Sequence, residues 1–251
     1  MVRGKHALVT GGQRGIGLAT AIALHEAGAR VTVLGRNERA LKEMLRDGQA
    51  EGYVLADVTS EAEMAEAFSD AVEFRGPVDI LVANAGGVET APFLRTDPDA
   101  FRRLFELNVM GAVLAIRAVL AGMVARKSGR IVAVASTAGL KGYGYVSAYC
   151  ASKHAVVGLV RALAVETASS GVTVNAVCPG YTDTDLVRDS VKRVGAATGR
   201  PASEILAGMI KGNPLGRLIR PEEVAAAILY LCGPAAAAVT GTTLAVAGGE
   251  L

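Results

Sequence analysis

Residues 6–24 read HALVTGGQRGIGLATAIAL, a short apolar run followed by a glycine-rich loop and then a helical pattern. The run at 6–10 is typical of a buried strand. Glycines at such a junction let the backbone approach a pyrophosphate, and the following helix N-terminus offers free N–H groups and the positive end of its dipole. The loop alone is a weak signal, because its spacing is not G-x-G-x-x-G and a tight turn also explains it. A P-loop is excluded, since G-x-x-x-x-G-K-[ST] does not occur.

Strand and helix patterns alternate along the rest of the 251-residue chain. Strands are predicted at 6–10, 30–34, 53–57, 79–83, 130–135, 172–177 and 242–246, and helices at 15–28, 38–47, 60–74, 98–126, 147–169 and 221–232. Most strand candidates are almost continuously apolar, as in strands covered on both faces. This order predicts right-handed βαβ crossovers and a doubly wound α/β fold with a parallel sheet of about seven strands. No linker divides the chain, so we expect one domain over residues 1–251.

Residues 181–220 interrupt this rhythm. The segment is long and polar, and it is punctuated by Gly195, Gly199, Pro201, Gly208, Gly212, Pro214 and Gly216. A stretch of this length without a strand is typical of a lid over a site. The alternative is an ordinary surface excursion.

Composition limits the classes of function. Hydrophobic residues make up 51% of the chain, which excludes global disorder. A net charge of +2 gives no electrostatic case for a nucleic-acid partner. The three cysteines lack zinc-type spacing, which indicates reduced thiols, a cytoplasmic location and no metal site. No signal-peptide pattern opens the sequence, and the apolar run 111–125 is interrupted by Arg117 and short for a bilayer, so we expect no membrane span.

The end of the second predicted strand indicates which dinucleotide would bind. A carboxylate is expected there, about 20 residues past the glycines, when a ribose 2′-hydroxyl is bound as in NAD. Gly35 and Arg36 occupy that place. A guanidinium binds a 2′-phosphate with charge-assisted hydrogen bonds, and Arg14 adds a second cation in the glycine loop. We therefore expect NADP(H) rather than NAD(H), with two solvated arginines as the alternative.

Tyr149 is followed four residues later by Lys153, and positions i and i+4 share one face of a helix. A phenol is a poor base at neutral pH, but a nearby ammonium and an oxidised nicotinamide both favour phenolate. Such a group protonates a carbonyl oxygen during reduction and accepts the proton in the reverse direction. Ser136, at the end of a predicted strand, would hydrogen-bond the substrate oxygen. Y-x-x-x-K is frequent by chance, and a serine at a strand end is common.

Together these features resemble the short-chain dehydrogenase/reductase family, and the likeness covers essentially the whole chain. The matching pieces are 10–17 (TGGQRGIG), Asp57-Val58, 84–86 (NAG), Asn108, Ser136, 149–153 (YCASK) and 179–184 (PGYTDT). The resemblance implies a single Rossmann-like catalytic domain that exchanges hydride between NAD(P) and an alcohol or ketone. Two positions depart from the family pattern: Ala83 replaces the usual Asn, and Ala247 replaces an Asp that is commoner before two glycines.

The resemblance also implies roles for individual residues. Tyr149 would be the proton donor, and Lys153 would bind the nicotinamide ribose and lower the Tyr149 pKa. Ser136 would position the carbonyl, and Asn108 would hold a water that extends the proton relay. The cofactor-binding residues implied are Gly11, Gln13, Arg14, Gly15, Ile16, Gly17, Arg36, Asp57, Val58, Asn84, Ala85, Gly86, Tyr149, Lys153, Pro179, Gly180, Thr182 and Thr184.

The substrate follows less directly. The chain is most like 3-oxoacyl-thioester reductases, so we expect reduction of a 3-oxoacyl thioester or related small-molecule ketone. Seven Lys or Arg against four Asp or Glu in 183–220 suit a phosphorylated carrier, although solvated charge explains them equally. Leu140, Tyr143, Tyr145 and Tyr181 are candidates for the substrate wall. Family members are usually homotetramers or homodimers.

Three alternatives remain open. The first is an NAD-linked secondary-alcohol or 3-hydroxyacyl-CoA dehydrogenase. The second is an NADP-binding regulator without catalysis, which the intact Ser136, Tyr149 and Lys153 argue against. The third is a serine hydrolase using Ser136, which is disfavoured because no G-x-S-x-G occurs.

Overall fold

A seven-stranded parallel sheet with the order β3-β2-β1-β4-β5-β6-β7 forms the centre of the molecule. The computed structural model describes residues 2–251. The strands are β1 (His6–Thr10), β2 (Arg30–Gly35), β3 (Gly52–Leu55), β4 (Ile80–Ala83), β5 (Gly129–Val134), β6 (Val172–Pro179) and β7 (Thr243–Val246). All five residues of β1 and all eight of β6 are buried, as their apolar runs predict for strands covered on both faces. The predicted Rossmann-like sheet is confirmed.

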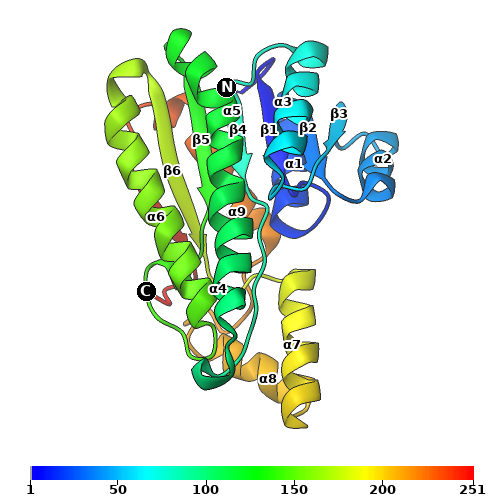
Figure 1. Ribbon diagram of the computed structural model, residues 1–251, viewed down its shortest axis with the longest axis vertical. Coiled ribbons are helices and arrows are strands. Elements are labelled where there is room, and N and C mark those ends of the chain that lie inside the picture. Colours follow the sequence, from blue (N-terminus) through cyan, green and yellow to red (C-terminus); the bar gives the residue numbers. More distant parts are fainter. Residues whose placement is uncertain (1) are drawn as a thin grey trace.

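Helices cover both faces of the sheet (Figure 1). They are α1 (Gly15–Glu26), α2 (Glu38–Arg46), α3 (Glu61–Arg75), α4 (Pro98–Phe105), α5 (Gly111–Ala125), α6 (Ser147–Thr167), α7 (Asp185–Thr198), α8 (Ala202–Ile210) and α9 (Pro221–Cys232). One core cluster joins the sheet to α3, α5 and α6, with Phe68, Ile116 and Val160 among its buried members. The second joins the opposite face to α1, α2 and α9 through residues such as Leu24 and Ile228.

The strand order opens a crevice at the carboxyl edge of the sheet. β1 pairs with β2 on one side and with β4 on the other, and both pairings are parallel. Because the order reverses between β1 and β4, the loops that leave these two strands turn to opposite faces. The glycine-rich loop and the segment that begins at Asn84 therefore flank one opening.

The predicted helix over 98–126 is interrupted. α4 ends at Phe105, a π-helical turn spans Glu106–Met110, and α5 begins at Gly111. The continuous apolar periodicity of this region hides the extra residue in the turn. A π turn inside a helix frequently marks a functional position, and this one contains Asn108.

Two helices lie within 181–220. Apart from an isolated bridge between Thr182 and Ile219, the structure assigns no strand to this segment. However, Gly195 lies inside α7 and Gly208 inside α8, where we expected breaks. An interior glycine costs a helix only about 1 kcal/mol, which packing can offset. Figure 1 shows both helices projecting beyond the end of the sheet, where a lid would have to sit.

Two helical stretches, Pro98–Ala125 and Ser147–Ser170, are long and apolar enough to cross a membrane by length and composition. Both contribute residues to the core beneath them, including Ile116, Met123, Val156 and Val160. Packing on the sheet therefore accounts for much of their hydrophobic character.

Candidate active site

A cavity of about 750 Å³ lies at the carboxyl edge of the sheet. Its walls come from the loops after β1, β2, β4, β5 and β6 and from α7 and α8. Of the residues expected to bind the cofactor, all but Gly17 line this cavity, and Ser136 lines it as well. Tyr143, Tyr145 and Tyr181 also line it, whereas Leu140 does not. The topology thus gathers expected cofactor-binding residues that are up to 173 positions apart, from Gly11 to Thr184, as the parallel strand ends dictate.

The glycine-rich loop is packed too tightly for side chains. A Cβ on Gly17 would lie 2.3 Å from the carbonyl oxygen of Gly11, and Gly11 itself has a φ of +64°. Asn84 fastens the loop, because its amide donates to the carbonyl oxygens of Thr10 at 2.9 Å and Gly11 at 3.2 Å. The Asn84 side chain therefore supports the loop from behind, which its place in the motif does not reveal.

The site fits a dinucleotide. Helix α1 begins after Arg14, whose side chain does not cap it, and Gly15 and Ile16 of its first turn line the cavity, where helix N-terminal N–H groups can bind phosphate. At the other end, a Cβ on Gly86 would lie 2.7 Å from Asn108 Oδ1 and 3.6 Å from Lys153 Nζ. The contact with Asn108 is too close for a side chain, so only a glycine fits at this position beside the Lys153 ammonium.

The surroundings of Arg36 bear on the choice of dinucleotide. Its guanidinium is exposed and lies 3.0 Å from Asp57 Oδ2. Hydrogen bonds from the backbone of Thr59, then from its hydroxyl and from Arg36, hold the pKa of Asp57 below its usual range. Gln13 lies over Gly35, and its buried Oε1 has no hydrogen-bond partner among residues 2–251. A cation and an unsatisfied amide thus meet at the end of β2.

Ser136, Tyr149 and Lys153 meet on the cavity wall. Lys153 is buried, donates to the carbonyl oxygen of Val134 at 2.8 Å, and holds its Nζ 5.8 Å from the centre of the Tyr149 ring. The predicted shared helix face is thereby observed. Ser136 extends from the end of β5, and its hydroxyl accepts from the backbone N–H of Ala138 at 3.1 Å.

Burial shifts the pKa values of this pair. It raises the pKa of Tyr149 to about 12, against an opposing hydrogen bond from Ser136. Burial also lowers the pKa of Lys153 to about 8. The protein by itself therefore favours a neutral phenol, and the predicted lowering of the Tyr149 pKa by Lys153 is not found in the protein alone.

Asn108 is buried behind the cavity wall. Its Oδ1 accepts from the N–H of Gly87 at 2.9 Å, and its Nδ2 donates to the carbonyl oxygen of Gly87 and to the hydroxyl of Ser152, both at 3.0 Å. Ser152, one residue before Lys153, is absent from the predicted site. Its place within 149–153 was visible, but nothing in the sequence shows that it meets Asn108.

The segment after β6 closes the site toward the lid. Thr184 lies against the glycine loop, since a Cβ on Gly15 would be 3.1 Å from its methyl group. Thr182 donates to the carbonyl oxygen of Gly180 at 3.0 Å, which turns the chain from β6 into α7. Within residues 2–251, no group of three or more His, Cys, Asp or Glu side chains is placed to hold a metal ion.

Comparison with known proteins assigns the family. The model of the short chain dehydrogenase family matches residues 5–195. The chain belongs to this family.

Individual short chain dehydrogenases refine this assignment. The chain is 43% identical to cis-4-hydroxycyclohexanecarboxylate dehydrogenase of Sinomonas cyclohexanicum, over 97% of this chain and 95% of that protein. It is 36% identical to acetoacetyl-CoA reductase of Shinella zoogloeoides, over 97% of each. The crystal structure of an actinorhodin polyketide ketoreductase variant with NADPH superposes with a TM-score of 0.94 at 38% identity, covering 100% of this chain and 98% of that one. The protein is an oxidoreductase that interconverts ketones and alcohols.

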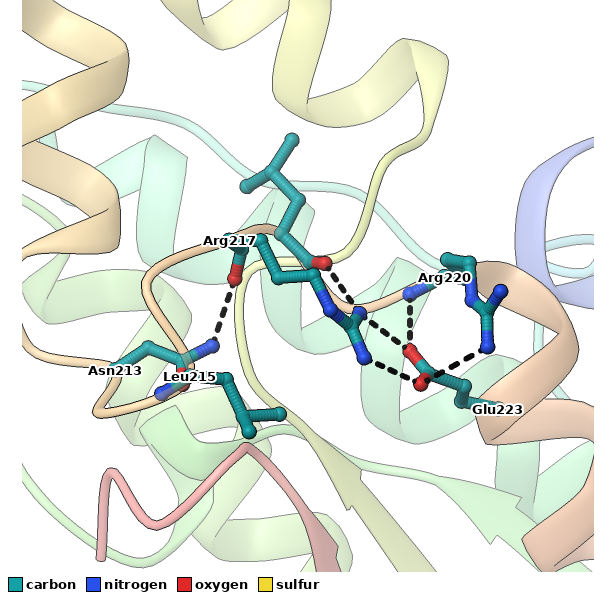
Figure 2. A network of polar contacts seen from close by, with 6 residues as sticks. Asn213, Leu215, Arg217, Arg220 and Glu223 are labelled. Atoms are coloured by element: carbon teal, nitrogen blue, oxygen red, sulfur yellow. Dashed lines mark hydrogen bonds and ion pairs between the residues drawn. The ribbon is translucent and has the colours of Figure 1, made fainter.

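The lid of this short chain dehydrogenase is less basic than its composition indicates. Arg188 pairs with Asp183 and Asp185, Lys192 with Asp189, and Arg200 with Glu204. Figure 2 shows the guanidinium of Arg217 bound to the Glu223 carboxylate, which also accepts from Arg220. Among the seven basic residues of 183–220, Arg193 and Lys211 have no carboxylate within 4.0 Å in the described part of the chain, residues 2–251. Of these two, only Arg193 lines the cavity.

Proposed function

We propose that the protein is an NADP(H)-dependent oxidoreductase that reduces a ketone to a secondary alcohol, with Tyr149 as the proton donor. The observation that supports this most is that Ser136, Tyr149 and Lys153 share one cavity with the glycine-rich loop. A hydride donor held by that loop and a proton donor in the same cavity are what carbonyl reduction requires.

The direction of the Tyr149 pKa shift suits reduction. A phenol with a pKa of about 12 carries its proton at neutral pH and is ready to give it to a carbonyl oxygen. The Ser136 hydroxyl would hold that oxygen, and the Lys153 ammonium would stabilise the phenolate left after transfer. The bound nicotinamide supplies or accepts the hydride, and its positive charge when oxidised favours the phenolate needed for the reverse reaction.

Gly35 and Arg36 support NADP(H). Positions 35 and 36, at the end of β2, carry no carboxylate of their own to repel a 2′-phosphate, and Arg36 is exposed on the cavity wall. To bind the 2′-phosphate, the Arg36 guanidinium must either break its ion pair with Asp57 or bind Asp57 and the phosphate at the same time. A guanidinium can bind a phosphate with paired hydrogen bonds. The cation of Arg14, which also lines the cavity, would add to the attraction.

An NAD-linked secondary-alcohol or 3-hydroxyacyl-CoA dehydrogenase is the second candidate. The pairing of Arg36 with Asp57 neutralises the cation, and the amide of Gln13, a neutral side chain that lines the cavity, would suit a ribose 2′-hydroxyl. Both features suit the cofactor that lacks the phosphate.

The substrate we propose is a 3-oxoacyl thioester or a related ketone. The part of the cavity left for the substrate, which we call the substrate compartment, would draw on the apolar side chains of the cavity lining, which include Val88, Leu107, Leu186 and Met209. These would bury an acyl chain or a ring and exclude water from the reacting groups. Most lid cations are already paired, so a phosphorylated carrier would find chiefly Arg193.

The decisive experiment is a panel of cyclic ketones, 3-oxo acids and 3-oxoacyl thioesters, assayed with NADPH and with NADH. Wild type should reduce at least one ketone faster with NADPH. Tyr149→Phe should bind NADPH normally but lose about 10²- to 10⁴-fold in turnover, because the general acid is gone. Tyr230→Phe, on α9 and half exposed, is the matched control and should keep full activity. Equal turnover by Tyr149→Phe would refute the mechanism.

We also propose a cytoplasmic homotetramer, with a homodimer as the alternative. Phe105 on α4, Val124 on α5 and Val165 on α6 are exposed although they are large and apolar. We propose that a second copy of the chain covers at least part of this exposed apolar surface. Light scattering of the purified protein gives the oligomeric state, and Val165→Asp should weaken the assembly.

A further inference from the structure

The segment after β7, residues 247–251, places a buried carboxylate beside the substrate compartment. Only 4% of the Glu250 side chain is exposed. Its Oε1 accepts a hydrogen bond from the Tyr143 hydroxyl at 2.6 Å and lies 3.4 Å from Lys141 Nζ. Lys141 also donates to the backbone carbonyl oxygen of Glu250 at 2.8 Å. Two side chains from the loop between β5 and α6, Lys141 and Tyr143, thus contact the same glutamate.

This contact continues toward the reacting groups. The Tyr143 hydroxyl also lies 2.7 Å from Thr137 Oγ1. A phenol has one proton, and the carboxylate can only accept, so Tyr143 donates to Glu250 and receives a hydrogen bond from Thr137. Burial and the charge of Glu250 raise the pKa of Tyr143 above its usual range, which keeps it a donor. The chain of hydrogen bonds therefore runs from the residue next to Ser136 to Glu250.

Glu250 also contacts the second loop of the substrate wall. A Cβ on Gly180 would lie 2.9 Å from Glu250 Oε2, so the loop after β6 packs directly on the carboxylate. In the next residue, Tyr181, the ring meets that of Tyr143 edge to face, with centroids 6.1 Å apart at 85°. Tyr143 and Tyr181 both line the cavity that contains Tyr149.

We propose that Glu250 is a positioning residue that holds Tyr143 and Tyr181 as the wall of the substrate compartment and thereby decides which ketones reach Tyr149. The inference rests on the proposed function, since it concerns the substrate of the same site. Glu250 touches none of the reacting groups. It acts through Tyr143, whose ring would otherwise be free to swing into the compartment or out of it.

The positioning of Tyr143 requires a hydrogen-bond acceptor in the side chain at position 250. Glu250→Ala removes the acceptor from the Tyr143 hydroxyl and the anion from Lys141, and leaves space beside Gly180. Glu250→Gln keeps an oxygen for Tyr143 and loses only the charge. Tyr143→Phe removes the same hydrogen bond from the other side. Leu251→Ala, at an exposed neighbour, is the matched control.

The test compares KM and kcat for a small cyclic ketone and a bulky bicyclic ketone, with NADPH affinity measured by fluorescence. Glu250→Ala should change the ratio of the two kcat/KM values by about tenfold or more, while the NADPH dissociation constant stays within about twofold. In Glu250→Gln, the ratio of the two kcat/KM values should stay close to the wild-type ratio. The double variant Glu250→Ala/Tyr143→Phe should be no worse than the more impaired single variant. A ratio unchanged in both Glu250 variants, or effects that multiply in the double variant, would overturn the proposal.

A second measurement separates this inference from the proposed function. The chain contains six tyrosines and no tryptophan, so its near-ultraviolet circular dichroism is dominated by tyrosine packing. Glu250→Ala should reduce that signal at an unchanged far-ultraviolet spectrum, and Leu251→Ala should not. Wild type that reduces no ketone would refute the proposed function alone. A tyrosine signal unaffected by Glu250→Ala would refute the positioning role.

Discussion

Asn108 donates a hydrogen bond through Nδ2 to the hydroxyl oxygen of Ser152, at 3.0 Å and across 44 residues of sequence. Ser152 in turn donates to the carbonyl oxygen of Tyr149 at 2.8 Å. The π-helical turn that contains Asn108 is thus tied to the helix that carries Tyr149 and Lys153. Any water or ligand group that Asn108 Oδ1 holds is placed by the same helix as the proton donor.

Ser152→Ala should therefore impair both stability and turnover. The substitution leaves one hydrogen of the buried Asn108 amide without an acceptor, which costs about 1–3 kcal/mol of unfolding free energy. Urea unfolding and steady-state kinetics measure the two effects. Ser147→Ala, on the same helix, is the matched control, because the buried Ser147 hydroxyl has no hydrogen-bond partner in the described part of the chain and its removal should cost little. Equal effects of the two substitutions would contradict the proposed role of Ser152 in tying Asn108 to the helix that carries Tyr149.

Arg36→Ala should weaken NADPH binding by about 10- to 100-fold, since a charge-assisted hydrogen bond contributes about 1.5–3 kcal/mol. NADH binding should change little. Fluorescence titration of both cofactors measures the difference. Arg39→Ala serves as control, because Arg39 is exposed on the adjoining helix and paired with Glu43. Unchanged NADPH affinity in Arg36→Ala would defeat the phosphate argument and favour the NAD-linked alternative.

Lys153→Met should stabilise the fold while abolishing catalysis. Burial lowers the Lys153 pKa from 10.5 to about 8, so the folded state binds this proton less tightly than the unfolded state. The shift corresponds to roughly 3 kcal/mol, because one pKa unit is about 1.4 kcal/mol. That cost is complete below about pH 8 and disappears as the pH rises through about 10.5.

Denaturant unfolding of wild type and Lys153→Met at about pH 7 and about pH 9.5 measures how the change in unfolding free energy depends on pH. The gain in unfolding free energy should be larger at the lower pH. Lys192→Met, at an exposed position of α7, should show no such pH dependence. A loss of stability at the lower pH would mean that the hydrogen bond from Lys153 to Val134 outweighs the desolvation of the ammonium.

Arg193→Gln should discriminate between charged and neutral substrates. Arg193 lines the cavity and donates to Ser190 Oγ at 3.2 Å. We expect kcat/KM to fall by about tenfold for a 3-oxo acid or phosphorylated thioester and to stay nearly constant for a neutral ketone, because a single ion pair is lost. Lys211→Gln is the control, since Lys211 also lacks an ion-pair partner in residues 2–251 but does not line the cavity. Equal losses on both substrates would assign Arg193 a structural role.

Local sequence patterns were sufficient for the layout of the fold. The continuous apolar runs and the intervening helical periodicity predicted seven strands close to their observed positions. Strands covered on both faces are apolar at almost every position, and such runs are easy to recognise in a sequence. The helices α7 and α8 were missed, since glycines inside them looked like breaks. The interruption at Asn108 was missed because a π turn leaves the apolar pattern almost unchanged.

The sequence by itself determined which groups carry the chemistry: the glycine loop, Arg36, and the Tyr149–Lys153 spacing on one helix face. These follow from local rules of backbone freedom, charge and helix periodicity. Only the tertiary structure decided what surrounds them. It pairs Arg36 with Asp57, neutralises most of the lid cations, joins Asn108 to Ser152, and places Glu250 beside Tyr143. The contacts of Arg36, Asn108 and Glu250 join residues from 21 to 107 positions apart, and only the parallel strand order brings their loops to one edge of the sheet.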